Sequence, residues 1–459
     1  MPQAALSEIL AAAKFDAPGA AEIAGKDPVL PLRYRVGAAG AASLAALGLA
    51  VAQLWALRGG AQQRVAVDLR AAAVSLRSAR YLRIDGKPPP ALWNPLSGFY
   101  RAREGWISIH CNFQNHRDAA MGVLGATTRE AAEQAAQRWY GEALEDAIHA
   151  AGGCAGFVRS DEQWERHPQA QAVALQPLIS IERIGDAPPE PLPKAARPLE
   201  GVRVLDLTRV LAGPTCARSL AEHGADVLKV SAAHLPDSGQ VELDTGIGKL
   251  SARIDLREAG GVAKLQELAR EADVFSQSYR PGALAGRGFS PEALARLRPG
   301  IVCVSLSAWG TSGPWRERRG FDSIVQAVSG IAYASGDGTK PKLLPVSAID
   351  YVSGYLMAFG ATLALARRAR EGGSWLVRVA LARTGKWIVD RGELPERTWR
   401  GLPEELPEAE LAPLLGEMDA PDGRIRHLRP VIQLSHTPPY WSRPPVPLGT
   451  HAPAWPPRA

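Results

Sequence analysis

Asp350 is the residue whose surroundings most favour chemistry in this chain of 459 residues. It follows a short apolar run, Leu343 to Ile349, and the next charged residue is Arg367. We expect a long apolar helix to begin here, which would bury the carboxylate beside the positive end of the helix dipole. A carboxylate in such a position is the first candidate for chemistry in this chain. The competing interpretation is that Asp350 only caps the helix through its N–H groups.

Asp322 is the second acid of interest, because it lies in the stretch GFDSIVQA, just before another apolar run of helical spacing. A short acidic side chain at that place is a preferred helix cap. We therefore interpret Asp322 as a cap that positions the loop before it, with a catalytic role as the alternative.

Other combinations of reactive residues are weaker. His110, Cys111 and His116 are close in the sequence, but strand alternation would turn His110 and Cys111 to opposite faces, so we expect no metal site. Ser305 and Ser307 lie in no GxSxG motif and no GxGxxG follows a strand, which argues against a serine hydrolase and a nicotinamide enzyme. The cysteines are widely spaced, as expected for free thiols in a reducing cytosol: Cys111, Cys154, Cys216 and Cys303.

The helix that begins near Asp350 has an apparent copy close to the N-terminus. Residues 36–69 and 346–381 each contain a small-residue loop, an apolar helix ending in Arg, a Gly-Gly turn and a β-like run with Arg-Val. Counted back from the turns, Asp350 falls opposite Gly37. Repeated units of this kind are typical of duplication or fusion of related domains.

The first copy, Val36 to Leu57, has no charged residue and is long enough to cross a bilayer. It is rich in Ala and Gly and contains Gln53, and its copy carries Asp350, which would be costly in lipid. We therefore expect both to be buried helices of a cytoplasmic protein without membrane contact. The N-terminal residues lack the basic start and apolar core of a secretory signal.

The rest of the chain indicates an α/β fold. Gly98 to His110 predicts a hairpin, and residues 127–151 predict a helix. After a Pro-rich linker, strand-like and helix-like stretches alternate, which predicts a mostly parallel sheet covered by helices. We expect four parts: an N-terminal part (1–190), the linker (191–198), a ligand-binding domain with Asp350 (199–395) and a Pro-rich C-terminal arm (396–459).

The net charge of +6 is spread along the chain. This mild excess favours an anionic small ligand over a nucleic acid, because dense Lys/Arg tracts, zinc-finger spacings and ribonucleoprotein-like aromatic motifs are lacking.

From the linker onward the residues resemble the class III (family III) CoA-transferases, a family that includes the alpha-methylacyl-CoA racemases. The resemblance runs, in the family's order, through PLEGVRVLDLTRVLAGPTCARSLAEHGADVLKV, GKLSARIDL, ADVFSQSYRPGALAGRGFS, SAWGTSGPW, GFDSIVQAVSG and VSAIDYVSG. The part before the linker resembles the family's later portion. The resemblance implies a Rossmann-like α/β fold with a rearranged or fused N-terminal half. It also implies an interlocked dimer, so that we expect a homodimer.

The resemblance implies an acyl-CoA:carboxylate CoA-transferase in which Asp350 attacks the thioester and passes through an aspartyl anhydride and an aspartyl-CoA thioester. Coenzyme A would be the acyl carrier, a small carboxylic acid the acceptor, and no metal would take part. The residues implied to contact CoA are Val210, Leu211, Lys249, Ser278, Tyr279, Arg280 and Arg287.

Two alternatives stay open. The first is a 2-methylacyl-CoA racemase or epimerase, but the racemases carry a His where this chain has Phe321, so that two-base proton transfer would lose one partner. The second is a non-catalytic acyl-CoA-binding homologue. It is suggested by departures from the family pattern: Ser231 and Ala232 stand where an acid and often an arginine are usual, and Ser278 replaces an asparagine.

Overall fold

The computed structural model describes residues 2–89, 93–235 and 239–458. In this part of the chain the largest sheet has seven strands, in the order β10-β9-β8-β11-β12-β13-β7. Neighbouring strands are parallel except for β7, which runs antiparallel to β13. The α/β class and the mostly parallel sheet are thereby confirmed. The strands are β7 (Ser180–Gly185), β8 (Arg203–Leu207), β9 (Asp226–Ser231), β10 (Lys249–Arg253), β11 (Val274–Gln277), β12 (Val302–Ser307) and β13 (Ser374–Ala380).

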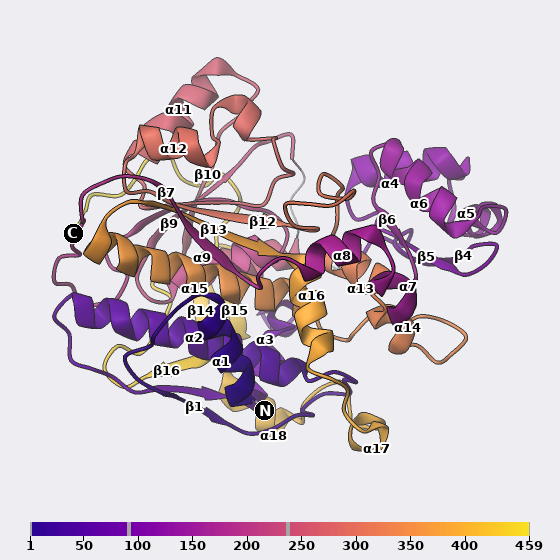
Figure 1. Cartoon of the computed structure of the whole chain (residues 1–459), viewed down its shortest axis with the longest axis horizontal. Coiled ribbons are helices and arrows are strands. Elements are labelled where there is room, and N and C mark those ends of the chain that lie inside the picture. The colour runs from indigo at the N-terminus through magenta and orange to yellow at the C-terminus, as the bar shows by residue number, and fades with distance from the viewer. Residues whose placement is uncertain (1, 90–92, 236–238, 459) are drawn as a thin grey trace.

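Side-chain alternation along these strands sorts the core into two layers. Val204, Val274 and Val302 belong to the cluster that includes helices α9 (Ala212–Ala221) and α15 (Ala348–Glu371). Their neighbours Leu205 and Phe275 point to the other face, under α11 (Ala259–Arg270) and α12 (Pro291–Leu297). Because both faces are covered, the strands consist of nearly continuous apolar residues, as parallel strands do. Figure 1 shows the sheet between these helix layers.

The two apolar helices pack side by side below the sheet (Figure 1): α2 (Val36–Leu57) and α15. Both are long and apolar enough to cross a membrane, yet 72% and 100% of their most apolar windows are buried inside the protein. Gly360 lets α15 also pack closely on β13, because a Cβ there would stand 2.5 Å from Cγ1 of Val377. The expectation that both helices are buried in the core is confirmed.

The repeat that the sequence indicated recurs in space. Helix α2 is followed by Gly59 (φ +81°), strand β2 (Val65–Asp68) and helix α3 (Leu69–Ser75). Helix α15 is followed by Gly372 (φ +69°), strand β13 and helix α16 (Leu381–Asp390). Positive φ angles at these turns need glycine, since other residues rarely adopt them.

A small lobe projects at the right of Figure 1, with its own core around Tyr100, Ile107 and Leu144. The expected hairpin is present, as β4 pairs antiparallel with β5. The single helix expected over 127–151 is wrong, because Tyr140 is extended and the chain forms two helices. The lobe contains β4 (Gly98–Arg101), β5 (Trp106–Ile109), β6 (Ala155–Phe157), α4 (Gln114–Leu124), α5 (Arg129–Ala136) and α6 (Gly141–Ala150).

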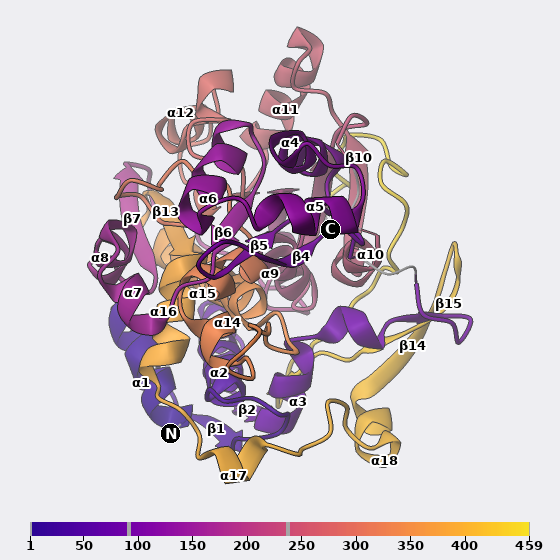
Figure 2. The ribbon, with the colours of Figure 1, turned by 90° about the vertical axis from the view of Figure 1, so that its right-hand side faces the viewer.

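The remaining segments connect the two ends of the chain to the rest of the protein. Strand β16 (Ile432–Leu434) of the C-terminal arm pairs with β2, and β14 (Leu415–Ala420) forms a hairpin with β15 (Gly423–Leu428), seen at the right of Figure 2. The four-part division stays a prediction, although β7, which precedes the linker, joins the main sheet. The other elements are α1 (Pro2–Ala12), β1 (Ala21–Ala24), η1 (Ser78–Tyr81), β3 (Arg83–Ile84), α7 (Asp161–Glu165), α8 (Pro168–Ala174), α10 (Gln240–Gly246), η2 (Ala285–Arg287), α13 (Asp322–Val328), α14 (Ile331–Ala334), α17 (Glu396–Trp399), α18 (Glu408–Leu411) and η3 (Ala412–Leu414).

Candidate active site

Asp350 lies in the first turn of α15, with 8% of its surface exposed. Within the residues that the structure describes, its carboxylate accepts no hydrogen bond and joins no ion pair. It lines two cavities at once, one on each side of the helix start. A buried carboxylate that makes no hydrogen bond and lines cavities is a candidate for a functional role, because most buried polar groups are paired.

Asp322 performs the capping role that Asp350 could have played. It begins α13, and its Oδ2 accepts the backbone N–H of Asp350 at 3.1 Å. Gln326 donates to Oδ1 of Asp322 and accepts the N–H of Leu344 at 2.8 Å, which fixes the loop before α15. Asp322 is therefore a cap, as the sequence indicated, but it caps α15 from a neighbouring element instead of capping its own helix.

The two carboxyls influence each other's ionisation. Burial raises the pKa of Asp350 well above its ordinary value, and the negative charge of Asp322 raises it further. Burial also raises the pKa of Asp322, although the hydrogen bonds from Asp350 N–H and from Gln326 act against that rise. The pair therefore titrates as a unit, and loss of the last proton requires a higher pH than for an exposed carboxyl.

Cavity A, of about 480 Å³, runs from Asp350 along the carboxyl ends of the strands. Its charged lining is almost wholly positive, since Asp350 is the one acid among its described residues. Five of the seven residues expected to contact CoA line it: Val210, Leu211, Ser278, Tyr279 and Arg280. The basic side chains are Arg209, Arg280, Arg316, Arg318, Arg319 and, when protonated, His234.

Cavity B, of about 430 Å³, lies on the other side of Asp350. Its lining combines aromatic and apolar residues with polar ones, among them Gln240, Asp322 and Gln326, and with the basic side chains of Arg77 and Arg80. The first turn of α15 and η1 are fastened together next to it, because Tyr351 Oη accepts the N–H of Ala79 at 3.2 Å. Cavities A and B share four lining residues, which separate them: Val210, Leu211, Phe321 and Asp350.

The N-terminus of α9 lies beside the same partition. Gly354, one turn after Asp350, packs so closely that an added Cβ would stand 2.5 Å from the carbonyl oxygen of Ala212. Val210 immediately before this helix has φ +69°, a conformation that a β-branched residue rarely adopts. Two N–H groups in the first turn of α9, those of Ala212 and Gly213, have no partner within the helix, whereas the third residue, Pro214, has no N–H.

Two of the residues expected to contact CoA lie elsewhere. Lys249 is 3% exposed, and its ammonium donates to Oδ2 of Asp206 and to the carbonyl of Pro214, both at 2.8 Å. The guanidinium of Arg287 donates to the carbonyl of Leu256. Neither residue lines cavity A or cavity B.

We expect Lys249→Met to lower the free energy of unfolding by about 3–5 kcal/mol, because it leaves the fully buried Asp206 without its closest cation. Urea unfolding measures this change. The matched control is Lys264→Met, whose ammonium pairs with the exposed Glu267 and whose loss should be nearly neutral. A stable Lys249→Met protein with impaired CoA binding would instead restore Lys249 as a ligand contact.

Sequence reasoning missed the aromatic wall of the site. His110, at the end of β5, stacks on Phe321 with ring centroids 3.9 Å apart and lines cavity B. Burial, assisted by nearby His116, lowers the pKa of His110 to about 3, so the ring is neutral at physiological pH. Its Nδ1 is buried without a hydrogen-bond partner in the described structure. No spacing in the sequence connects His110 with Phe321, because the contact joins the small lobe to the domain that carries Asp350.

The first copy of the repeat has a similar carboxylate cap, but it has no acid at the position that corresponds to Asp350. Asp27 accepts the N–H groups of Gly37 and Ala38 at 3.0 and 2.8 Å, as Asp322 accepts that of Asp350. A Cβ on Gly37 would stand 2.4 Å from Oδ1 of Asp27. At Gly37, the position opposite Asp350 in the repeat, Asp27 therefore occupies the space that a side chain would need. Elsewhere in the described residues, no three His, Cys, Asp or Glu side chains gather as a metal site would require.

Comparison with known proteins adds an independent observation. The family model described as CoA-transferase family III matches residues 16–188 and 199–406. An acetyl-coenzyme A transferase from Hypoxylon pulicicidum is 36% identical over 45% of this chain and 36% of its own length. The succinyl-CoA–L-malate CoA-transferase alpha subunit of Chloroflexus aurantiacus is 33% identical over 42% of this chain and 49% of its own. The chain thus spans half or less of the length of these two relatives.

Among solved structures, a CAIB/BAIF family protein from Brucella suis is 27% identical, with a TM-score of 0.39. The match covers 42% of this chain and 55% of that one.

Proposed function

The chain belongs to CoA-transferase family III, and from the geometry around Asp350 we propose that it is an acyl-CoA:carboxylate CoA-transferase with this residue as nucleophile. The observation that supports this most strongly is that Asp350 is buried, accepts no hydrogen bond in the described structure and faces both cavities. Donor CoA would occupy the basic cavity A, and the acyl group would occupy cavity B.

The proposed reaction begins when an Asp350 oxygen attacks the thioester carbonyl carbon. The new C–O bond forms, the C–S bond breaks, and CoA leaves as a thiolate from a mixed anhydride. The thiolate then attacks the Asp350 carbonyl carbon of the anhydride, which releases the donor acid as a carboxylate and forms the aspartyl-CoA thioester.

The second half of the reaction repeats these steps with the acceptor. The acceptor carboxylate displaces CoA thiolate from Asp350, and the thiolate then attacks the acceptor carbonyl, giving the new acyl-CoA and free Asp350. No proton is consumed over the cycle, so the enzyme needs an ionised nucleophile and oxyanion stabilisation but no general acid.

The local structure supports these requirements. Burial keeps the Asp350 carboxylate poorly solvated, which raises its nucleophilicity at the cost of a higher pKa. The free N–H groups at the start of α9 would stabilise the negative oxygen of each tetrahedral intermediate. Asp322 accepts the backbone N–H of Asp350 and leaves the carboxylate of Asp350 without a hydrogen bond.

The proposal is tested by screening acyl-CoA donors against a set of small carboxylic acids and detecting new thioesters by liquid chromatography. We expect at least one pair to exchange CoA with neither net hydrolysis nor dependence on added metal. Tight CoA binding without exchange on a broad panel would contradict the proposal and favour a non-catalytic binding protein.

Arg280→Gln is expected to raise KM for acyl-CoA by about tenfold with little change in kcat, because a charge-assisted hydrogen bond to a phosphate contributes about 1.5 kcal/mol. Steady-state kinetics at low ionic strength measure the effect, which added salt should weaken. Arg287→Gln is the matched control, since Arg287 bonds to the Leu256 carbonyl outside cavity A. Equal effects of the two changes would refute the assignment of the CoA phosphates to cavity A.

A racemase or epimerase is the second candidate, and His110 is the observation that favours it. Although Phe321 stands where the racemases carry His, the imidazole of His110 stacks on Phe321 and lines cavity B with Asp350. Exchange of the α-proton of an acyl-CoA into deuterated water, without transfer to an acceptor, would identify this activity.

We also propose a cytoplasmic location and a homodimer. The four cysteines are free and buried, which is consistent with a reducing compartment. The homodimer rests on the family resemblance alone, and sedimentation equilibrium would test it.

A further inference from the structure

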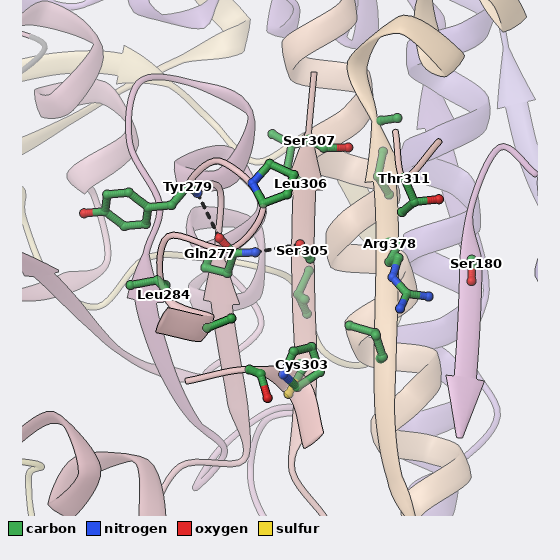
Figure 3. A pocket seen from close by; sticks show the side chains of 18 of the residues that line it. Ser180, Gln277, Tyr279, Leu284, Cys303, Ser305, Leu306, Ser307, Thr311 and Arg378 are labelled. Carbon is green, nitrogen blue, oxygen red and sulfur yellow. Dashed lines mark hydrogen bonds between the residues drawn. The ribbon is translucent and has the colours of Figure 1, made fainter. Parts of the chain in front are cut away.

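Cavity C, of about 390 Å³, lies outside the site described above, on the opposite face of the main sheet. Its floor is made by alternate residues of four neighbouring strands, because side chains two apart point to the same face. Figure 3 shows these side chains rising from the strands, with Gln277 and Ser305 side by side and Cys303 below them. The floor residues are Phe275, Gln277, Cys303, Ser305, Leu376, Arg378, Ser180 and Glu182.

The lining of cavity C changes character from one end to the other. Phe275, Cys303 and Leu376 form an apolar floor at one end, which Phe289 and Leu294 continue under α12. Further along the same strands, at the other end, the lining becomes polar and basic, with Ser305, Ser307 and the guanidinium groups of Arg280, Arg316 and Arg378. A ligand that fits this arrangement has an apolar body and one anionic end.

At the polar end, hydroxyl donors make no hydrogen bond to the protein in the described structure. Gln277 uses its Oε1 to accept the N–H of Tyr279 at 2.9 Å and one N–H of its Nε2 to donate to Oγ of Ser305 at 2.6 Å. Ser305 therefore accepts, and within the described residues its own O–H makes no further hydrogen bond. Ser307 likewise accepts the N–H of Gly310 at 3.0 Å. The O–H groups of Ser305 and Ser307 at the sheet surface can thus donate hydrogen bonds to a ligand in the cavity.

The charge balance at the polar end also favours an anion. Glu182 is the one acid among the described lining residues, and its carboxylate already accepts hydrogen bonds from Ser180 and, at 2.7 Å, from Arg378. The hydrogen bond from Ser180, followed by the one from Arg378, keeps the pKa of Glu182 below its ordinary value, so it remains charged and paired. Arg316 pairs with the neighbouring Glu317 at 3.4 Å, so Arg280 is the guanidinium that leaves the rim with net positive charge.

We propose that cavity C is an accessory binding site for an apolar monocarboxylate, with its hydrocarbon part on the Phe275–Leu376 floor and its carboxylate at the Ser305 and Arg378 end. Such an acid belongs to the same chemical class as the free acids of the proposed reaction, but the site does not include Asp350. It adjoins cavity A, with which it shares six lining residues: Tyr279, Arg280, Pro281, Leu306, Ser307 and Arg316.

The test uses the full chain and octanoate as the probe, with binding measured by isothermal titration calorimetry. Arg378→Gln should weaken octanoate binding by about fivefold or more, because it removes a charged donor to the carboxylate. Thr311→Trp should weaken it as well, since Thr311 is an exposed residue at the rim whose replacement fills the cavity without disturbing the core. Arg183→Gln is the matched control, because Arg183 pairs with Asp186 outside the cavity.

The site is supported if octanoate binds, both cavity variants weaken it, the control does not, and octylamine fails to bind. Absence of octanoate binding, or binding that neither Arg378→Gln nor Thr311→Trp weakens, would overturn it. The inference stands apart from the proposed function, because an Asp350→Asn protein should bind octanoate at cavity C as well as the unmodified protein does. Failure of one proposal therefore leaves the other measurable.

Discussion

Asp350→Asn is expected to lower the rate of CoA transfer by about 10³-fold or more, because the amide cannot form the anhydride on which every later step depends. The same change should leave the protein as stable as before, or more stable. The carboxyl is buried and its pKa is raised, so the stability that it contributes is present at low pH and is lost as pH rises through the folded-state pKa. A neutral amide removes this penalty at pH 7.

Initial rates of thioester exchange and thermal unfolding curves measure the two effects on one preparation. Asp27→Asn is the matched control, since Asp27 is a half-buried carboxylate that accepts the first N–H groups of the other repeated helix and serves only as its cap. That variant should keep its transfer activity and lose less than the ~1 kcal/mol that complete loss of a cap costs, since the Asn oxygen can still accept one of the two N–H groups. If the Asp350→Asn variant kept its transfer activity, the assignment of Asp350 as the nucleophile would be refuted.

Asp322→Asn should move the acid limb of the kcat/KM profile to lower pH. The nucleophile must be ionised, so activity falls as pH falls through the raised pKa of the pair. Removing the negative charge of Asp322 removes one of the two causes of that raised pKa, which leaves Asp350 ionised at more acidic pH. The amide oxygen of Asn can still accept the N–H of Asp350, so we expect the rate at neutral pH to change little.

Asp322→Ala separates the charge from the hydrogen bond. It also removes the charge, but it leaves the Asp350 N–H without an acceptor, and we expect it to lose about 1 kcal/mol of stability and much of its neutral-pH activity. An acid limb that stays in place or moves to higher pH in Asp322→Asn would refute the electrostatic coupling of the pair.

The sequence was sufficient for the elements that local pattern controls. Strand–helix alternation after the linker predicted the mostly parallel sheet to which β8, β9, β11 and β12 belong, and the apolar runs predicted α2 and α15. The position of Asp350 in the first turn of a buried helix followed from the lack of charge around it. The family resemblance directed attention to the loop before α9 and to the segment 278–280, all of which line cavity A.

What the sequence could not supply depends on contacts between distant segments. Lys249 carries the charge expected of a phosphate ligand, but only the fold reveals that Asp206 is within 2.8 Å and holds it in the core. In the sequence, Asp322 stands where a residue that caps its own helix is expected, yet in the structure it caps α15. His110 belongs to a hairpin of the small lobe, and its place beside Phe321 arises from packing between parts of the chain more than two hundred residues apart.

The most direct test of the central claim is mass spectrometry of the peptide that contains Asp350, after incubation with an active acyl-CoA and quenching with hydroxylamine. Hydroxylamine attacks the activated carboxyl of the anhydride or thioester and leaves a hydroxamate on the residue that carried the intermediate. A hydroxamate on Asp350, dependent on acyl-CoA, is the predicted result. Transfer that proceeds with no hydroxamate there, or with the label on Asp322, would contradict the account.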